Sequence, residues 1–557
     1  MSAIFYDHLL RHGPWQEFER NTARLLLHAG WRNPQLVGRT GDGGVDVLAT
    51  DAKGRLCLFQ CKFTSGTPPG PASITEVRNA GKLYGADGLY VVTSTKPTNS
   101  FFSETSRLKS LGLSIEYLGP DRLASLSASV PAYAPTRVEL YDFQAEAVSE
   151  IRSALLSSGQ AQLVLATGLG KTVVASEVVA DLLRDGLLGD GRVLVLAHTI
   201  PLVNQLISAF WRQLPASVPT HRLAQGETPT SFEGVTFASF QTLMNIENPP
   251  SFDLIVVDEA HHLGAPGYMD VISRVSSPKI LGITATPWRS DGVNISSVLG
   301  VPVFSMGIKE GLAQDYLSKV DYRFFVDRID WEFVHSNSQY GYTISDLNKK
   351  LLLPTRDEVA INEITKVFNE QHRKRGIVFS PSQRHARSFA SDLRRHGFTA
   401  DAITSEDDHI SRHRKLSQFA SGKIKFLCAI DIFNEGMDVP DVDLLVFMRV
   451  THSRRIFIQQ LGRGLRVSPV KDKVVVLDFA ADIRRIHGTL DLTQADEKGE
   501  VERMLLSHVN VAFSDRSMGN FFYEWIADMG NIQDLEEDEV VRMPIIDPQQ
   551  FNFPNSL

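Results

Sequence analysis

Hydrophobic residues in the first part of the chain fall into short runs and amphipathic stretches that alternate along the sequence. A helix is predicted from about Trp15 to Ala29, where the apolar residues lie on one side. A capping box, Ser73-x-x-Glu76, is expected to open a second helix, and a third is expected near Phe101–Leu111. Apolar runs between turn residues predict the strands, at Val45–Ala49, Leu56–Phe63, Leu89–Thr93 and Ile115–Leu118. The order α-β-β-α-β-α-β predicts a small α/β domain over residues 1–124.

The pattern changes after a stretch rich in Ser, Ala and Pro, which we interpret as a linker over residues 125–137. Beyond it, apolar runs without polar alternation indicate strands buried on both faces, as in parallel sheets covered by helices. The runs form two sets: Leu163–Leu165, Val193–Leu196, Val235–Phe237, Leu254–Val257 and Ile280–Ile283, then Gly376–Phe379, Phe426–Ala429, Leu444–Met448 and Val474–Leu477. Two tandem parallel-sheet α/β domains are therefore expected, at 138–290 and 358–490, with a less regular connecting region at 291–357.

Composition places the chain among ordinary globular proteins. It has 557 residues, 43% of them hydrophobic and 22% charged, which suggests three to four domains. No run of 18 apolar residues and no basic-then-apolar start are present, so neither a membrane span nor a secretory signal is expected. Three cysteines cannot frame a disulfide scaffold, and the expected location is the cytoplasm.

The net charge of −8 is unevenly distributed. Residues 491–557 hold 14 acidic and 4 basic side chains and are expected to form an acidic C-terminal extension. The other 490 residues hold 53 basic and 51 acidic side chains, a net charge of +2. A nearly neutral body can carry basic grooves, so the overall charge does not exclude a nucleic acid as partner.

A candidate phosphate-binding loop follows the predicted strand Leu163–Leu165. It reads Ala166-Thr167-Gly168-Leu169-Gly170-Lys171-Thr172 and opens a helix, as such loops do. Glycines at 168 and 170 let backbone N–H groups surround phosphate oxygens, while Lys171 would reach the outer phosphates and Thr172 would ligate Mg²⁺. Leu165 stands where the general pattern has its first glycine, so a chance glycine-rich turn remains an alternative.

Two acidic residues, Asp258 and Glu259, end the apolar strand Leu254–Val257. Carboxylates at this end of a parallel strand face the crevice where ligands bind. Asp258 is expected to hold Mg²⁺ and Glu259 to polarise the attacking water. The alternative is an ordinary acidic turn.

These segments resemble the core of superfamily-2 helicases and translocases, with two RecA-like domains between Leu140 and about Ile486. The motifs that carry the resemblance are Tyr141-Asp142-Phe143-Gln144, the loop Ala166–Thr172, Asp258-Glu259-Ala260-His261, Thr284-Ala285-Thr286-Pro287, Glu435-Gly436-Met437-Asp438 and Gln459-Gln460-Leu461-Gly462-Arg463-Gly464-Leu465-Arg466. The resemblance implies an ATP site in which Tyr141 and Gln144 read the adenine. It also implies contributions to ATP binding by Gly436, Asp438 and Gln459.

By the same resemblance, Arg463 and Arg466 are arginine fingers, since guanidinium groups neutralise charge on a transferring phosphoryl group. Taken singly, they could equally be surface residues in ion pairs. The loop and the DEAH sequence resemble most the branch that holds type I and type III restriction translocases and nucleotide-excision helicases, which usually acts on duplex DNA.

The N-terminal domain carries a second candidate site. Asp46 ends a glycine-rich turn, and Gln60 and Lys62 lie two apart in the next strand, so both project to one face. A carboxylate, an oxygen ligand and a lysine can hold Mg²⁺, activate water and offset charge on a phosphodiester.

This segment resembles the Mrr-type restriction endonucleases of the PD-(D/E)xK class. Gln60 stands where that class usually has a second acid, and Gln is a weaker Mg²⁺ ligand. Glu19, on the first helix, is expected to supply the missing charge. Mn²⁺ is expected to substitute for Mg²⁺, and Gln60→Glu to retain activity. The alternative is an ordinary ion pair between Asp46 and Lys62.

The sequence thus predicts an ATP-dependent DNA translocase fused to a Mg²⁺-dependent endonuclease, in restriction or anti-phage defence. Double-stranded DNA is the expected partner, and further subunits of a restriction system are possible partners. Two alternatives stay open. One is a DNA-repair helicase whose N-terminal domain only binds DNA, and the other is an RNA helicase.

Overall fold

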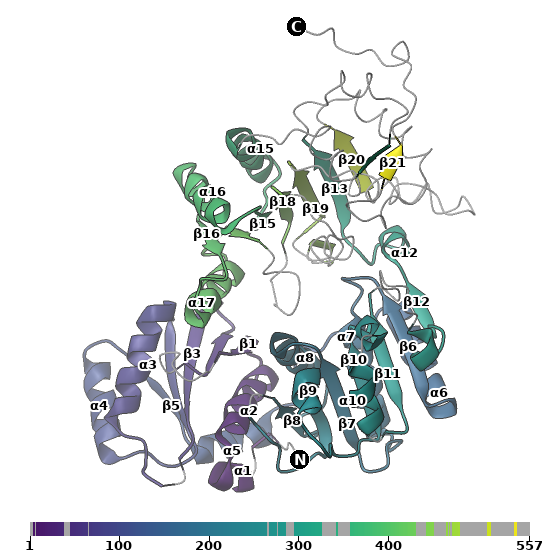
Figure 1. Cartoon of the computed structure of the whole chain (residues 1–557). Coiled ribbons are helices and arrows are strands. Elements are labelled where there is room, and N and C mark those ends of the chain that lie inside the picture. Colours follow the sequence, from purple (N-terminus) through teal and green to yellow (C-terminus); the bar gives the residue numbers. More distant parts are fainter. Residues whose placement is uncertain are drawn as a thin grey trace, which may run out of the picture. The chain divides into compact units, whose positions relative to one another are not determined.

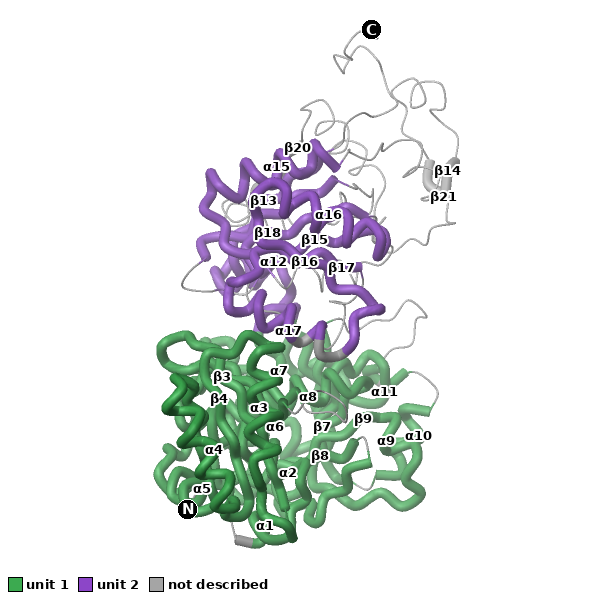
Figure 2. Tube along the Cα trace, turned by 90° about the vertical axis from the view of Figure 1, so that its left-hand side faces the viewer, with its two compact units in different colours: residues 1–165, 170–305 green, residues 166–169, 306–557 purple. Residues whose placement is uncertain are grey.

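The computed structural model describes most of the chain. The described residues are 4–5, 7–37, 45–64, 66–224, 226–264, 267–275, 277–285, 295–325, 341–343, 357–430, 442–449, 464–465, 467, 471–479, 509–513 and 540–542. They form two compact units, one of residues 1–165 and 170–305 and one of residues 166–169 and 306–557 (Figure 2). The first unit contains both the N-terminal domain and the first RecA-like domain.

The N-terminal domain is a five-stranded mixed sheet between helices (Figure 1). Its elements are α1 (Asp7–His12), α2 (Trp15–His28), β1 (Arg32–Leu36), β2 (Val47–Thr50), β3 (Leu56–Lys62), α3 (Pro71–Tyr84), β4 (Gly88–Thr93), α4 (Asn99–Ser110), β5 (Glu116–Leu118) and α5 (Pro120–Ser129). The strands lie in sequence order, with β1, β2 and β3 antiparallel and β3, β4 and β5 parallel. Helices α3 and α4 cover one face and α2 the other, so the central strand β3 is buried.

This architecture confirms the expected α/β fold and adds elements that the hydrophobic pattern missed. Strand β1 is polar and contains Pro34, as edge strands tolerate. The expected capping box is wrong: α3 begins at Pro71 after Gly70, and no side chain caps it. Ser73 is buried inside the first turn of α3, and Glu76 therefore does not take part in a helix cap.

The first RecA-like domain is built on a seven-stranded sheet in the order β12-β6-β11-β10-β7-β9-β8. Its elements are α6 (Asp142–Ser157), β6 (Gln160–Leu165), α7 (Lys171–Arg184), β7 (Arg192–Ala197), α8 (Ile200–Gln213), β8 (Thr220–Leu223), β9 (Gly234–Ser239), α9 (Phe240–Met244), β10 (Leu254–Asp258), η1 (Ala260–Gly264), α10 (Tyr268–Arg274), β11 (Ile280–Thr284), α11 (Ser296–Leu299) and β12 (Phe304–Met306). Strands β6 to β11 pair in parallel, as the continuous apolar runs predict.

The second RecA-like domain has a parallel seven-stranded sheet in the order β16-β17-β15-β18-β19-β13-β20. Its elements are α12 (Ile308–Ala313), β13 (Lys319–Phe324), α15 (Asp357–Glu370), β15 (Gly376–Phe379), α16 (Gln383–Arg395), β16 (Ala400–Ile403), α17 (His409–Ala420), β17 (Phe426–Ala429), β18 (Leu444–Phe447), β19 (Lys473–Asp478) and β20 (Val509–Phe513). Two strands come from outside the expected span 358–490: β13 from the connecting region and β20 from the acidic extension. A further pair, β14 (Gly341–Thr343) with β21 (Val540–Arg542), joins the same two regions.

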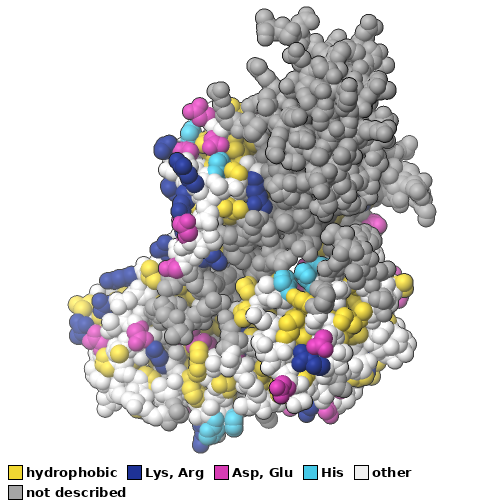
Figure 3. Space-filling model, viewed as in Figure 1, with side chains coloured by type: hydrophobic (Ala, Val, Ile, Leu, Met, Phe, Trp, Pro, Cys, Tyr) yellow, Lys and Arg dark blue, Asp and Glu magenta, His cyan; other side chains and the backbone are white. Residues whose placement is uncertain are grey.

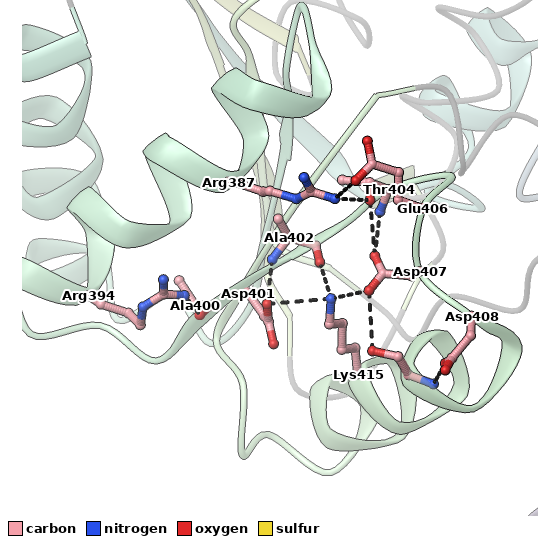
Figure 4. Close-up of polar contacts among 11 residues, drawn as sticks. Arg387, Arg394, Ala400, Asp401, Ala402, Thr404, Glu406, Asp407, Asp408 and Lys415 are labelled. Atoms are coloured by element: carbon pink, nitrogen blue, oxygen red, sulfur yellow. Dashed lines mark hydrogen bonds and ion pairs between the residues drawn. The ribbon is translucent and has the colours of Figure 1, made fainter.

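One lysine fixes the turn between β16 and α17. Lys415 donates to the Ala402 carbonyl at 2.6 Å and to Asp407 at 2.5 Å, and Asp407 also accepts from the backbone N–H of Thr404 (Figure 4). Arg387 closes the group from α16 through Thr404 and Glu406. Because Lys415 and Asp407 are each only 12% exposed, their charges compensate each other where water is scarce.

Within the first unit, helix α2 is docked on the RecA-like domain by buried arginines. Arg20 pairs with Glu227, which also accepts from Arg222 at 2.9 Å. Arg24 donates to the carbonyls of Pro215 at 2.8 Å and Val218 at 2.7 Å. Full burial lowers the pKa of Arg24 to about 9. Buried charges are unfavourable without such partners. The contact between α2 and the RecA-like domain is therefore a specific interface.

The expected linker 125–137 differs from a free tether. Its first residues belong to α5, which continues to Ser129. Ala132 accepts from the backbone N–H of Ala216 at 2.6 Å, and the carbonyl of Pro131 contacts His28 at 3.2 Å. The composition indicated flexibility, but these hydrogen bonds hold the connection against both domains.

We expect Glu227→Gln to destabilise the first unit by roughly 3–5 kcal/mol, because the change leaves two neighbouring arginines without a buried counter-charge. The midpoint of thermal unfolding measures the effect. Glu233→Gln, an exposed position of the same segment, is the matched control and should leave the midpoint unchanged. Equal midpoints for the two variants would show that the buried pair contributes no stability.

Candidate active sites

The phosphate-binding loop has the expected place and backbone. It joins β6 to α7, with Lys171 as the first residue of the helix. Gly168 and Gly170 have φ values of +100° and +82°, which disfavour any side chain at these positions. Thr167, Gly168, Lys171 and Thr172 are all partly exposed, so a ligand can reach them. N–H groups of the first turn of α7 are therefore available to an anion.

Asp258 and Glu259 stand at the carboxyl end of β10, close enough to Lys171 for its charge to act on both. Burial, and then the neighbouring Glu259, raise the pKa of Asp258 to about 7. Burial would also raise the pKa of Glu259, but the hydrogen bond from His261 and the charge of Lys171 lower it to about 2. Glu259 is thus held ionised, as a group that polarises water must be, and a divalent cation would favour the same state in Asp258.

Two features of this site were not predicted from the sequence. Glu259 has a φ of +48°, a conformation that costs energy in a non-glycine residue and is common at functional sites. His261 contacts Glu259 at 3.3 Å and the hydroxyl of Thr284 at 3.0 Å. Thr284 ends β11, the strand between β10 and β6. The His261 ring therefore links the acidic pair to the end of β11, where the expected motif Thr284-Ala285-Thr286-Pro287 begins.

Gln144 lies against the phosphate-binding loop. It is 3% exposed, and its Oε1 accepts from the backbone N–H of Tyr141 at 3.1 Å. A Cβ built on Gly170 would lie 2.5 Å from Gln144 Nε2. Tyr141 itself is 45% exposed and stacks on Phe143. Of the two residues expected to read adenine, Gln144 is thus held beside the loop and the Tyr141 side chain is accessible.

In the N-terminal domain, Asp46 and Gln60 are neighbours across two strands. The backbone N–H of Asp46 donates to Phe59, and its Oδ2 accepts from the N–H of Cys61 at 2.6 Å. These two hydrogen bonds place Asp46 beside the part of β3 from Phe59 to Cys61, which contains Gln60. Gln60 is fully buried and its Oε1 has no hydrogen-bond partner within the described part of the chain, which leaves an acceptor available for a cation.

Lys62 pairs with Glu76 rather than with Asp46 in the structure. The Lys62 ammonium lies 2.6 Å from Glu76 Oε2, and the same oxygen accepts from Gln60 Nε2 at 2.5 Å. Glu76 belongs to α3, so Gln60 and Lys62 project together toward that helix, as their spacing predicted. The alternative interpretation, an Asp46–Lys62 ion pair, does not hold among the described contacts. Glu76 was assigned to a capping box from its local pattern, and no sequence signal pointed to β3.

Glu19 approaches β3 from the opposite face. Burial raises the pKa of Cys61 well above its ordinary value, and the charges of Asp46 and Glu19 add to the rise. Cys61 projects toward α2, away from Gln60 and Lys62. Across the part of the chain that the structure describes, no three His, Cys, Asp or Glu side chains gather closely enough to hold a metal ion by themselves.

These donors nevertheless fit a weakly held divalent cation. Mg²⁺ commonly takes one or two carboxylates and completes its shell with water and substrate phosphates. Asp46 would supply the carboxylate, and the Gln60 oxygen, which has no hydrogen-bond partner among the described residues, would supply a neutral ligand.

Five of the expected ATP-site residues lie outside the described residues: Gly436, Asp438, Gln459, Arg463 and Arg466. The turn at 41–44 before Asp46 lies outside them as well. In the described part of the second RecA-like domain, Lys and Arg side chains line the surface formed by α16 and α17 (Figure 3). The exposed arginines of α16 are Arg384, Arg387, Arg394 and Arg395. Among the described helices, none has the length and apolar composition to cross a membrane.

Comparison with known protein families matches three segments. Residues 137–289 match the family described as type III restriction enzyme, res subunit, and residues 358–468 match the helicase conserved C-terminal domain. Residues 10–113 match the restriction endonuclease family of the Mrr catalytic domain. The chain therefore combines two segments that match superfamily-2 helicases of the restriction type with a segment that matches Mrr-type restriction endonucleases. Each matched range covers most of one sheet, while β5, β12, β13, β19 and β20 lie outside the ranges.

Relatives of the helicase core come from both translocases and restriction enzymes. DNA 3'-5' translocase XPB2 of Sulfurisphaera tokodaii is 27% identical over 61% of this chain and 81% of its own length. The type I restriction enzyme EcoAI endonuclease subunit of Escherichia coli is 25% identical over 60% of this chain and 45% of its own length. The chain thus spans less than half of that relative.

A solved structure, the type ISP restriction-modification enzyme LlaBIII bound to DNA, has the same fold with a TM-score of 0.53 and 17% identity. The match covers 94% of this chain and 42% of that one.

We expect Gly170→Ala to impair ATP binding strongly, because a Cβ there would push Gln144 from the loop and from its hydrogen bond to Tyr141. Gly186→Ala is the matched control: Gly186 also has a positive φ, +64°, but open space around it. Each change costs about 1–2 kcal/mol of backbone strain. Nucleotide affinity and ATP hydrolysis should fall only in Gly170→Ala. Similar losses in both would mean that strain, and not Gln144, matters.

Proposed function

We propose that the chain is an ATP-driven translocase on double-stranded DNA that works with its own Mg²⁺-dependent endonuclease domain, in restriction or anti-phage defence. The observation that carries the proposal is that one compact unit holds both sets of groups, Lys171 with Asp258–Glu259 and Asp46 with Gln60 and Lys62. The three family matches favour the same combination. A restriction setting would supply partner subunits for target recognition.

In the motor, Lys171 binds the outer phosphates and the first-turn N–H groups of α7 surround them. Thr172 and Asp258 hold the Mg²⁺ that accompanies ATP, and Glu259 orients the attacking water. Tyr141 and Gln144 contact the base. Gly436, Asp438 and Gln459 complete the nucleotide site by resemblance, with Arg463 and Arg466 as arginine fingers. His261 contacts both Glu259 and Thr284, so a movement of the Glu259 side chain would be transmitted to Thr284.

In the nuclease, Asp46 and Gln60 hold Mg²⁺, for which Mn²⁺ can substitute, and Lys62 offsets charge on the scissile phosphodiester. When bound, the cation supplies a nucleophilic water and polarises the phosphate. Glu19 adds negative charge on the α2 side of β3.

Two other functions compete. In the first, the motor repairs DNA and the N-terminal domain only binds it, which metal-dependent nicking of plasmid DNA would contradict. In the second, the motor acts on RNA, which stronger ATPase stimulation by RNA than by duplex DNA would support. The Mrr-type match favours DNA over RNA.

We expect Lys171→Ala to abolish DNA-stimulated ATP hydrolysis, because it removes the charge on the outer phosphates. Asp46→Ala should end DNA cleavage and spare ATP hydrolysis, because it removes a carboxylate from the nuclease metal only. Both activities are measured on linear and circular duplex DNA, with and without ATP. The exposed substitutions Lys82→Ala and Asp121→Ala serve as controls for lost charge. Parent-like cutting by Asp46→Ala would refute the nuclease assignment.

A further inference from the structure

The helix that follows β3 contributes a carboxylate to the nuclease site that no motif predicts. Glu76 Oε2 contacts two residues of the expected set at once, Lys62 Nζ at 2.6 Å and Gln60 Nε2 at 2.5 Å. Glu76 is 45% exposed and Lys62 is 32% exposed, so this contact lies at the mouth of the site, while Gln60 is fully buried beneath it.

The chemistry of the three groups fixes how the Gln60 amide is turned. A carboxylate can only accept hydrogen bonds, and a lysine ammonium can only donate them. The Gln60 atom that faces Glu76 must therefore be the NH₂ group, and the carbonyl oxygen must point away from it. That oxygen is buried and has no hydrogen-bond partner among the described residues, and the next residue, Cys61, donates its backbone N–H to Asp46.

A glutamine is a poor substitute for a carboxylate as a metal ligand unless its oxygen is held toward the cation. The two ends of a carboxamide are nearly equal in shape, so only a hydrogen-bond partner distinguishes them. Glu76 is such a partner. Its negative charge lies next to Lys62, on α3, whereas a second acid at position 60 would carry that charge on β3.

We propose that Glu76 is a positioning residue of the nuclease, which orients Gln60 so that its oxygen binds the metal and holds the Lys62 ammonium beside it. The inference deepens the proposed nuclease function and rests on it. It also changes the expectation for Gln60→Glu. In that variant two carboxylates would face each other within hydrogen-bond distance, so the change is expected to impair the site.

The test compares Glu76→Gln, Gln60→Glu and the double variant Gln60→Glu/Glu76→Gln in the full chain. Gln60→Glu places two carboxylates face to face, and Glu76→Gln replaces a group that can only accept by an amide that can accept or donate, so Gln60 is no longer held in one orientation. The double variant restores one group that can only accept, with the roles of the two positions exchanged. We expect each single variant to lose about 10–100-fold in cleavage and in Mn²⁺ affinity, as is typical for groups that orient metal ligands. The double variant should recover to within a few-fold of the parent.

Mn²⁺ affinity is measured by calorimetric titration without DNA, so the result does not depend on turnover, and DNA-stimulated ATP hydrolysis reports that the chain is folded. Glu104→Gln, which breaks an exposed Glu104–Arg107 pair on α4, is the control for a lost surface carboxylate and should change neither readout. Unchanged Mn²⁺ binding and cleavage in Glu76→Gln, or a double variant no better than either single one, would overturn the inference while Asp46→Ala still supports the nuclease. A parent that neither binds Mn²⁺ nor cuts DNA would instead overturn the proposed nuclease itself.

Discussion

Polar and charged side chains that are removed from water need a partner, and this need organises each part of the first unit. At the ATP site, Lys171 acts on the buried pair Asp258 and Glu259. In the nuclease domain, the buried Gln60 amide donates to the partly exposed Glu76, which also pairs with Lys62. Between the two domains, Glu227 is held by two arginines. Burial of the hydrophobic strands positions the backbone, and the charged and polar contacts then determine which side chains pair at each site.

The parallel sheets and the motor site could be predicted because their signals are local and strong. Uninterrupted Val, Leu and Ile runs become buried strands; Asp258 ends one of them, and Lys171 follows another after the glycine-containing loop. Strands with weaker patterns were missed: β13 alternates charged and apolar residues, and β20 is a short apolar run inside an acidic extension. Both join a sheet edge through contacts between residues that are distant in sequence.

Glu76 shows why part of the nuclease site could not be predicted. Its spacing from Ser73 fits a helix cap, which is a local rule, whereas its actual partners lie 14 and 16 residues earlier on a strand. The helix starts two residues before Ser73, so the cap has no place, and the carboxylate instead meets an amide and an ammonium. The capping-box spacing therefore does not identify the partner of Glu76, because the neighbouring strand β3 provides a charged partner and an amide donor.

Helix α2 connects the two chemistries most directly. Successive residues of a helix point about 100° apart, so neighbours can face different domains. Glu19 acts on Cys61 of β3, and Arg20, the next residue, pairs with Glu227 of the RecA-like domain. The charge of Glu19 also acts on Arg222, the second partner of Glu227. Neighbouring residues of one helical turn therefore interact with strand β3 of the nuclease domain and with the edge of the RecA-like sheet. A shift of that edge would have to move the helix or break a buried ion pair.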